Sequence, residues 1–133
     1  MNYSLFYLYP MNFTVNFPML IGVIFLIIAI IAKRFPSAKI NASYGYRSKR
    51  SMKNIELWNH AQAIFPVALM RGAFGLILLG VLLWALGSSE PVKAIAGIAG
   101  MFVVIIWLSI HVEGRLKRFD VQMNRNRNHE PEA

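Results

Sequence analysis

Long runs of apolar residues, separated by polar and basic segments, are the main pattern along this chain. Nearly uncharged stretches occupy residues 17–32, 67–87 and 94–112. They are apolar in blocks rather than in alternation, and about 20 such residues in a helix cross a hydrocarbon core of roughly 30 Å. Because a backbone inside lipid must satisfy its own hydrogen bonds, each stretch is predicted to be a transmembrane helix.

The segment between the first two stretches is polar, basic and aromatic. Pro36 is expected to end the first helix, and the residues that follow have no apolar period, so a structured turn is predicted there. Asn41 is suited to bridge such a turn through its side-chain amide. Gly45, between Tyr44 and Tyr46, permits a positive φ or a close backbone approach.

A short amphipathic helix is predicted after this turn, lying in the membrane interface. Ser51 is the expected N-cap, and Ile55, Trp58 and Phe65 form a loosely apolar stripe, as is typical of interfacial helices. Pro66 removes one backbone donor and is expected to bend the chain where this helix passes into the second span.

The predicted fold is therefore all-α: an integral membrane protein with three transmembrane helices and a short interfacial helix between the first and second. The chain is expected to form one domain over residues 1–133. Its segments are an interfacial lead-in (1–16), the first span (17–32), a motif loop with the interfacial helix (33–66), the second span (67–87), the third span (94–112) and a basic tail (113–133). The third helix is expected to stop at Glu113-Gly114-Arg115. Either Met1 or Met11 is consistent with the start of the chain.

Charge predicts the orientation of the spans. The loop 33–63 carries seven basic residues against Glu56 alone, and the tail is also basic, whereas the N-terminus has no Lys or Arg and the hairpin 88–93 has only Lys93. Under the positive-inside rule the loop and the C-terminus are cytoplasmic, with the N-terminus and hairpin outside. The net charge of +8 lies beside the spans, so we expect anionic lipid headgroups as partners rather than nucleic acid.

The basic loop contains a long motif, N-x-x-Y-G-Y-R followed by S-x-x-N-x-x-x-W. Its residues are Asn41, Tyr44, Gly45, Tyr46, Arg47, Ser51, Asn54 and Trp58. With its neighbours it reads Lys39, Ile40, Asn41, Tyr44, Gly45, Tyr46, Arg47, Ser48, Arg50, Ser51, Met52, Lys53, Asn54, Glu56 and Trp58. This pattern resembles the signature of the SdpI family of bacterial membrane proteins. Ala61 and the later Glu113, Leu116 and Phe119-Asp120 are also similar, whereas Ser48 replaces a common Thr and Arg71 replaces an apolar or small residue.

The resemblance covers roughly residues 18–120 and implies a bacterial inner-membrane protein. It also implies immunity to, or sensing of, a secreted membrane-active peptide toxin, with recruitment of a cytoplasmic repressor as a further family role. An oligomeric small-solute transporter subunit and a structural or assembly subunit of a larger membrane complex remain alternatives. A peptide toxin or another membrane protein is the expected partner.

Three ionisable residues near the inner ends of the spans are candidates for an ion pair. Arg47 in the loop and Arg71 in the second span approach the depth of Glu113 under this topology, and charged groups at membrane depth are usually paired. We expect Glu113 to pair with Arg47 or Arg71 and so to close the loop over the bundle. Arg47 is equally suited to bind a headgroup phosphate or a partner carboxylate.

The sequence gives little support for a metal site, a cofactor or a catalytic site. His60 and Glu56 are four residues apart and His111 lies elsewhere, but two ligands do not make a metal site. The absence of cysteine excludes disulfides and thiolate metal sites. We expect no cofactor and no enzymatic activity, because no nucleophile–base pair or phosphate loop is apparent.

Small residues recur at helical spacing in the second and third spans. Ala68 and Gly72 form one small-xxx-small pair, and Ala96 and Gly100 form another. Such faces allow close helix contact. They are consistent either with packing of the two spans within one chain or with a homo-oligomer.

Overall fold

The computed structural model describes residues 16–129, which form a bundle of three helices and the segments that join them. The helices are α1 (Phe17–Arg34), α2 (Ile55–Ala85) and α3 (Glu90–His129). Each is long and apolar enough to cross a membrane. No strand occurs in this part of the chain, and the predicted all-α fold with three spanning helices is confirmed. Residues 1–15 of the predicted lead-in (1–16) and the two possible start residues lie outside the described part of the chain.

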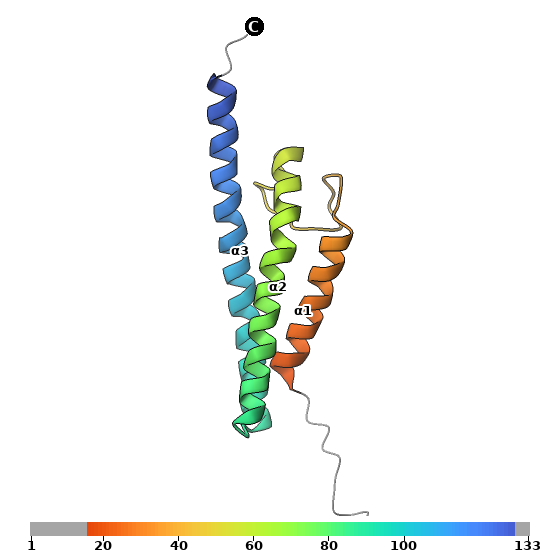
Figure 1. The fold of residues 1–133 in the computed structure, drawn as a ribbon, viewed down its shortest axis with the longest axis vertical. Coiled ribbons are helices and arrows are strands. Elements are labelled where there is room, and N and C mark those ends of the chain that lie inside the picture. The colour runs from red at the N-terminus through yellow and green to blue at the C-terminus, as the bar shows by residue number, and fades with distance from the viewer. Residues whose placement is uncertain (1–15, 130–133) are drawn as a thin grey trace, which may run out of the picture.

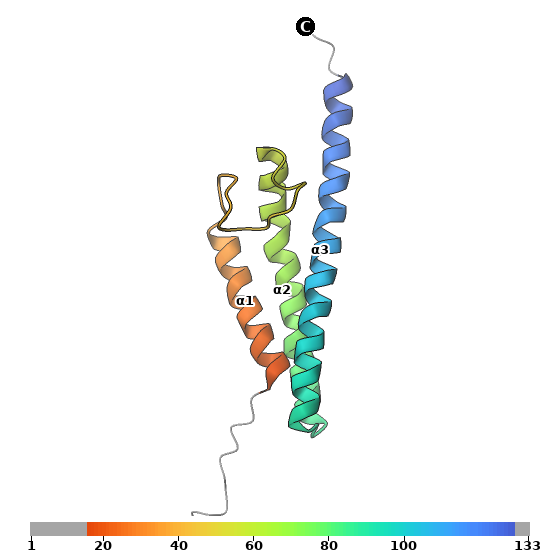
Figure 2. The ribbon, with the colours of Figure 1, turned by 180° about the vertical axis from the view of Figure 1, so that it is seen from behind.

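Each helix runs antiparallel to the next along the chain, and the bundle has two different ends (Figure 1). α2 lies between α1 and α3 where the loop of residues 35–54 joins α1 to α2, and α3 extends beyond both (Figures 1 and 2). We call this the loop end. A short hairpin joins α2 to α3 at the opposite end, where Gly87 adopts a positive φ of 64°. Such a conformation after a helix is typical of glycine.

The ends of α1 follow ordinary capping rules. Asn16 is the N-cap, and its side chain accepts a hydrogen bond from the Met19 N–H at 3.3 Å. The same side chain donates to the carbonyl of Gly80 at 2.8 Å, which ties the start of α1 to α2. Lys33 and Arg34 lie in the last turn, where positive charge is favoured by the helix dipole.

The separate interfacial helix is not present, and this prediction is wrong. α2 begins at Ile55 and continues through Pro66 to Ala85. A proline removes one backbone hydrogen bond, and Pro66 is fully buried, so packing holds the helix together at this position. The N-cap is Asn54 rather than Ser51: the Asn54 side chain accepts from the Leu57 N–H at 2.8 Å.

The third helix also continues past its predicted end at Glu113-Gly114-Arg115. α3 remains helical to His129. Beyond the apolar stretch, Leu116 is fully buried and Asp120 is only 8 % exposed, so this extension packs against the rest of the protein. Part of the basic tail is therefore an element of the fold.

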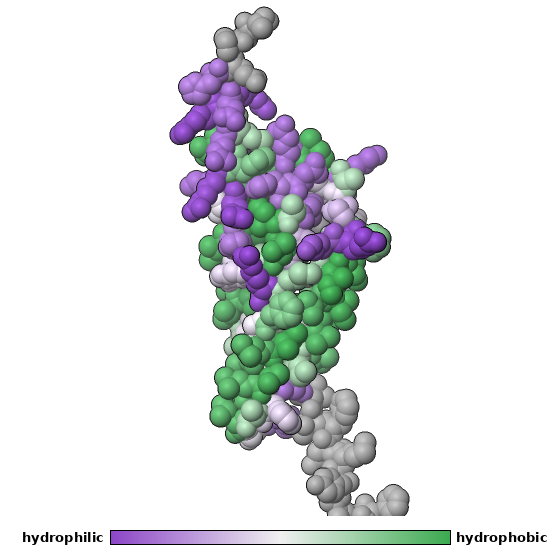
Figure 3. Space-filling model, viewed as in Figure 1, coloured by the Kyte–Doolittle hydropathy of each residue, from purple (hydrophilic) through white to green (hydrophobic). Residues whose placement is uncertain are grey.

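Close helix contact depends on small residues within the chain. Gly22 of α1 lies directly against Ala73 and Ile77 of α2. Gly72 faces Val104 of α3 with no room for a larger side chain. Leucine, valine and alanine side chains fill the half of the bundle near the loop end, in a core of Ala29, Leu57, Ala61, Ala68, Leu69, Leu108, Val112 and Leu116. The face seen in Figure 3 is mostly apolar along the lower part of the molecule, and hydrophilic residues gather at the loop end.

Candidate binding site at the loop end

The first part of the loop is a turn organised by Asn41. Its side-chain oxygen accepts hydrogen bonds from the N–H groups of Ser43 (2.9 Å) and Tyr44 (2.8 Å). Its side-chain nitrogen donates to the carbonyl of Lys39 (2.9 Å) and to the Ser37 hydroxyl (2.6 Å). One amide therefore fixes the path of residues 37–44, while Tyr44 remains 40 % exposed.

The Gly45–Tyr46 backbone is held against α2 by Gln62. The Tyr46 N–H donates to the side-chain oxygen of Gln62 at 2.9 Å, and the side-chain nitrogen of Gln62 donates to the Tyr46 carbonyl at 3.0 Å. Gly45 has a positive φ of 101°, and a Cβ at this position overlaps the Gln62 amide. Only glycine accommodates both the conformation and the close approach.

The Tyr46 side chain joins the loop to α3. Its hydroxyl donates to the Glu113 carboxylate at 3.2 Å, and its ring packs against Phe65. Burial, together with the negative charge of Glu113 and the hydrogen bond to it, raises the pKa of Tyr46 from 10.0 to about 12. The phenol is therefore held in its neutral form, as a donor.

Ser51 and Trp58 are both fully buried, and each stabilises the loop. The Ser51 hydroxyl accepts from the Ser48 N–H at 2.8 Å and lies 3.2 Å from the Tyr46 carbonyl, to which it can donate. Ser51 thus closes a turn rather than capping a helix. The Trp58 indole N–H donates to the Ser37 carbonyl at 2.8 Å, which fixes the start of the loop on α2.

The predicted partners of Glu113 are corrected by the structure. Its carboxylate lies 3.5 Å from the guanidinium of Arg50, not beside Arg47 or Arg71. Arg47 is exposed and donates back to the carbonyl of Ala42 within the loop. Arg71 lies further along α2, beside Gly72 and Trp107, and so away from the loop.

A second carboxylate of α3, Asp120, extends this cluster of charges. It lies 3.3 Å from both the Arg50 guanidinium and the Lys53 ammonium. Because the Asp120 side chain is only 12 % exposed, these contacts are less screened by water than ordinary surface pairs. The long helix α3 therefore supplies both carboxylates that hold the basic part of the loop.

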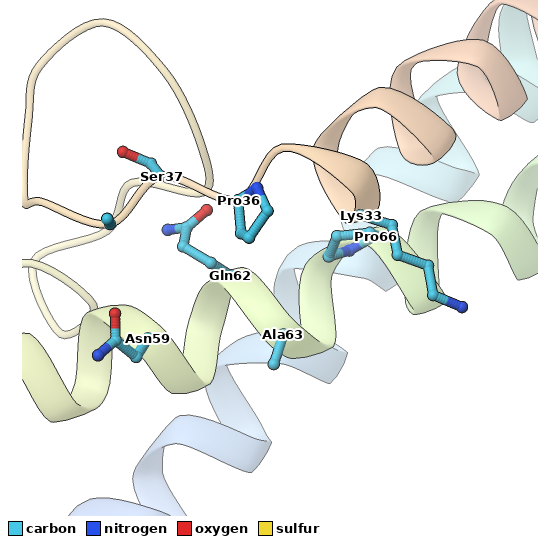
Figure 4. Close-up of a pocket in the computed structure, with 8 residues that line it drawn as sticks. Lys33, Pro36, Ser37, Asn59, Gln62, Ala63 and Pro66 are labelled. Atoms are coloured by element: carbon cyan, nitrogen blue, oxygen red, sulfur yellow. The ribbon is translucent and has the colours of Figure 1, made fainter.

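A hollow of about 500 Å³ opens beside the anchored loop. It lies between the end of α1, the first residues of the loop and α2, with Asn59 and Gln62 projecting from α2 toward Pro36 and Ser37 (Figure 4). Its lining combines apolar and polar residues: Lys33, Pro36, Ser37, Ala38, Asn59, Gln62, Ala63 and Pro66. Such a lining is suited to hold an apolar group and to orient a polar group beside it.

Comparison with known proteins places this arrangement in a family. The sequence profile of the SdpI/YfhL protein family matches residues 37–112, which include most of the loop, all of α2 and the apolar stretch of α3. The chain belongs to the SdpI/YfhL family. It is 35 % identical over 96 residues to the uncharacterized protein YfhL of Bacillus subtilis (strain 168), an alignment that covers 72 % of this chain and 82 % of that protein. No solved structure matches. Membership and the three apolar helices together indicate a multi-pass bacterial membrane protein.

The motif of this SdpI/YfhL-family chain gathers at one end of the bundle, where most of its side chains make contacts that hold the loop. Sequence reasoning missed the residues that receive the loop, above all Gln62 and Asp120. One signal was present for Gln62, an amide between two alanines just before the apolar part of α2. Asp120 was noted only within the resemblance, without a structural role.

Proposed function

We propose that this protein binds a membrane-active peptide toxin at the loop end and so protects the cell from it or senses its presence. One observation carries the proposal: the loop is held in a fixed shape by side chains of α2 and α3 beside an open hollow. A binding surface ordered in advance loses less conformational entropy on association than a mobile loop. Membership in the SdpI/YfhL family supports the same function.

The exposed cations and the hollow define the kind of peptide that fits. Arg47 and Lys49 are exposed on the loop, and Lys33 lies at the edge of the hollow. An apolar side chain of the peptide occupies the hollow against Pro36 and Pro66. A nearby side-chain carboxylate or the C-terminal carboxylate of the peptide pairs with Lys33. The positive-inside pattern favours a cytoplasmic position for this surface, at the level of the inner headgroups.

A binding role is better supported than transport. A transporter subunit needs a polar path through its helices, whereas the positions buried between these helices include Ala29, Leu69, Ala73, Leu76 and Leu108. The contacts among the described motif residues are those of a rigid scaffold. We therefore assign the protein a binding function rather than an enzymatic or transport function.

Protection from killing tests the proposal. The protein is expressed in a strain sensitive to several membrane-active peptide toxins, and survival is compared with that of an empty-vector strain. We expect protection from at least one peptide, and loss of this protection in Asn59→Trp, which fills the hollow from an exposed position of its lining without touching a hydrogen bond of the loop. Leu78→Trp, at a lipid-facing position that is 69 % exposed, is the matched control and keeps protection. Unchanged killing by every peptide, with the protein present in the membrane, contradicts the proposal.

A further inference from the structure

Arg71 is a charged residue at a depth where the rest of the bundle is apolar. Gly22, in the apolar part of α1, lies against Ala73 of α2. Arg71 is two residues, or about 3 Å, further toward the loop end, which is still level with apolar residues of α1. Arginine keeps its charge in proteins, and a charge at this depth is costly unless it is paired or reaches the interface.

The protein supplies no carboxylate for this charge within residues 16–129. The ion-paired carboxylates of this part of the chain are Glu90, Glu113 and Asp120, and their partners are Lys93, Arg50 and Lys53. Neither these three nor Glu56, the remaining carboxylate of these residues, lies within ion-pair distance of Arg71 or of Arg115, which is on α3. Two guanidinium groups on facing helices are thus left for a negative charge from outside the described chain.

Both arginines line one hollow on the α2–α3 side of the bundle. It has a volume of about 170 Å³, and its polar lining residues are Arg71 and Arg115 with His60 and His111. No acidic side chain is among the described residues that line it. Figure 3 shows hydrophilic side chains extending down between α3 and α2 into the apolar part of the surface.

An apolar groove continues from this hollow along the membrane-facing surface. It has a volume of about 280 Å³ and is lined by Gly72, Gly75, Val103, Val104 and Trp107. Arg71 lines both spaces, which are therefore adjacent. The Trp107 ring stacks on His111 with ring centres 5.2 Å apart and so forms a wall where the two spaces meet.

We propose that this surface binds one anionic phospholipid of the leaflet at the loop end. The phosphate lies between Arg71 and Arg115, within reach of His60 and His111, and one acyl chain lies in the groove over Gly72 and Gly75. A guanidinium matches phosphate oxygens through paired hydrogen bonds. The groove selects a lipid over a soluble phosphate compound, because only a lipid brings an acyl chain to cover it. The lack of a carboxylate in the hollow selects an anionic headgroup over one that carries a choline cation.

Lipid binding by the intact purified protein tests this proposal. Full-length protein is stripped of lipid in detergent and titrated with phosphatidylglycerol, phosphatidylcholine or glycerol 3-phosphate, and bound species are counted by native mass spectrometry. We expect phosphatidylglycerol to bind about tenfold more tightly than the other two, and Arg71→Gln to weaken it by about tenfold, the effect of losing one charge-assisted contact. Arg115 lines the same hollow, so we expect Arg115→Gln to weaken phosphatidylglycerol binding by the same factor. This variant replaces Arg71→Gln if that protein is poorly produced. Arg34→Gln, at the end of α1 and lining neither space, leaves binding unchanged.

Four results overturn the proposal. Equal binding of phosphatidylglycerol and phosphatidylcholine removes the charge selectivity. An equal loss in Arg34→Gln shows diffuse attraction to the basic end rather than a site. Tight binding of glycerol 3-phosphate shows a phosphate site that does not need the groove. A lipid-free dimer that Arg71→Gln dissociates shows that a second copy of the chain occupies this face.

Discussion

Gln62 is the side chain that joins the backbone of Tyr46 in the loop to α2. Its amide both donates to and accepts from Tyr46, and it is only 6 % exposed. A buried backbone N–H or carbonyl that loses its partner is costly because water does not replace the bond. This amide is therefore a main support for the conformation of Gly45 and Tyr46.

We predict that Gln62→Leu lowers the free energy of unfolding by about 2 kcal/mol, because it leaves the Tyr46 N–H without a partner and the Tyr46 carbonyl with only the Ser51 hydroxyl as a donor. The measurement is thermal or denaturant unfolding of the purified protein in detergent. Asn59→Leu, one turn earlier and exposed, is the control and changes stability by less than about 0.5 kcal/mol. Equal effects of the two substitutions contradict the role given to Gln62.

Tyr46 gives a prediction for alkaline pH. Its pKa is raised from 10.0 to about 12 by burial and by Glu113, so its contribution to stability is complete below pH 10 and is lost as the pH rises toward 12. The phenolate absorbance of wild type minus that of Tyr46→Phe should titrate with a midpoint near pH 12. Glu113→Gln should lower the midpoint. A midpoint near 10 in the folded wild type is incompatible with the contact.

The motif residues were identifiable from the sequence, but their partners were not. Asn41 and Gly45 act locally, through contacts a few residues away that turn chemistry predicts. Gln62, Glu113 and Asp120 lie 16, 67 and 70 residues from the groups they bind. Such pairs depend on the register of the packed helices. For this reason Glu113 was recognised as a partner of the loop while Arg50 was not.

At the scale of the helices, contact between α1 and α2 depends on the absence of a side chain at Gly22. A Cβ there meets the Ala73 carbonyl at 2.8 Å and Ile77 at 2.7 Å. A larger residue must therefore push the helices apart, because the Ala73 contact is with backbone.

We predict that Gly22→Val destabilises the protein by about 1–3 kcal/mol. Gly114→Ala is the matched control, since nothing lies within 4 Å of a Cβ at that position. Alanine is a better helix former than glycine, so the control should be neutral or more stable by up to about 1 kcal/mol. Melting temperatures in one detergent measure both variants, and a stable Gly22→Val contradicts the close packing of α1 on α2.

The sequence predicted the positions of the helices better than their lengths. Apolar runs located all three spans because lipid demands them. They did not show that α2 begins at Ile55 or that α3 continues to His129. Both extensions lie beyond the apolar runs and are held by contacts between distant segments, such as those of Trp58 and Asp120. Proline and glycine were read as breaks, but burial and packing outweigh them here.

For the whole molecule, the central claim is that three crossings hold the loop at one polar end and that this end faces the cytoplasm. The two ends of the bundle differ strongly, since the basic loop and the extension of α3 lie together at the loop end (Figures 1 and 3). The hairpin at the opposite end carries only Lys93 and Glu90 as charged residues, and these pair with each other at 2.8 Å. Under the positive-inside rule, this difference in basic residues predicts that the loop end is cytoplasmic.

Cysteine labelling in intact cells tests this claim most directly, because the chain contains no cysteine of its own. Lys49→Cys places one thiol on the exposed loop, and Ser89→Cys places one on the exposed hairpin. With a maleimide that does not cross the inner membrane, we predict labelling of Ser89→Cys in intact cells and of Lys49→Cys only after the cells are opened. Labelling of Lys49→Cys in intact cells contradicts the orientation and, with it, the proposed cytoplasmic binding surface.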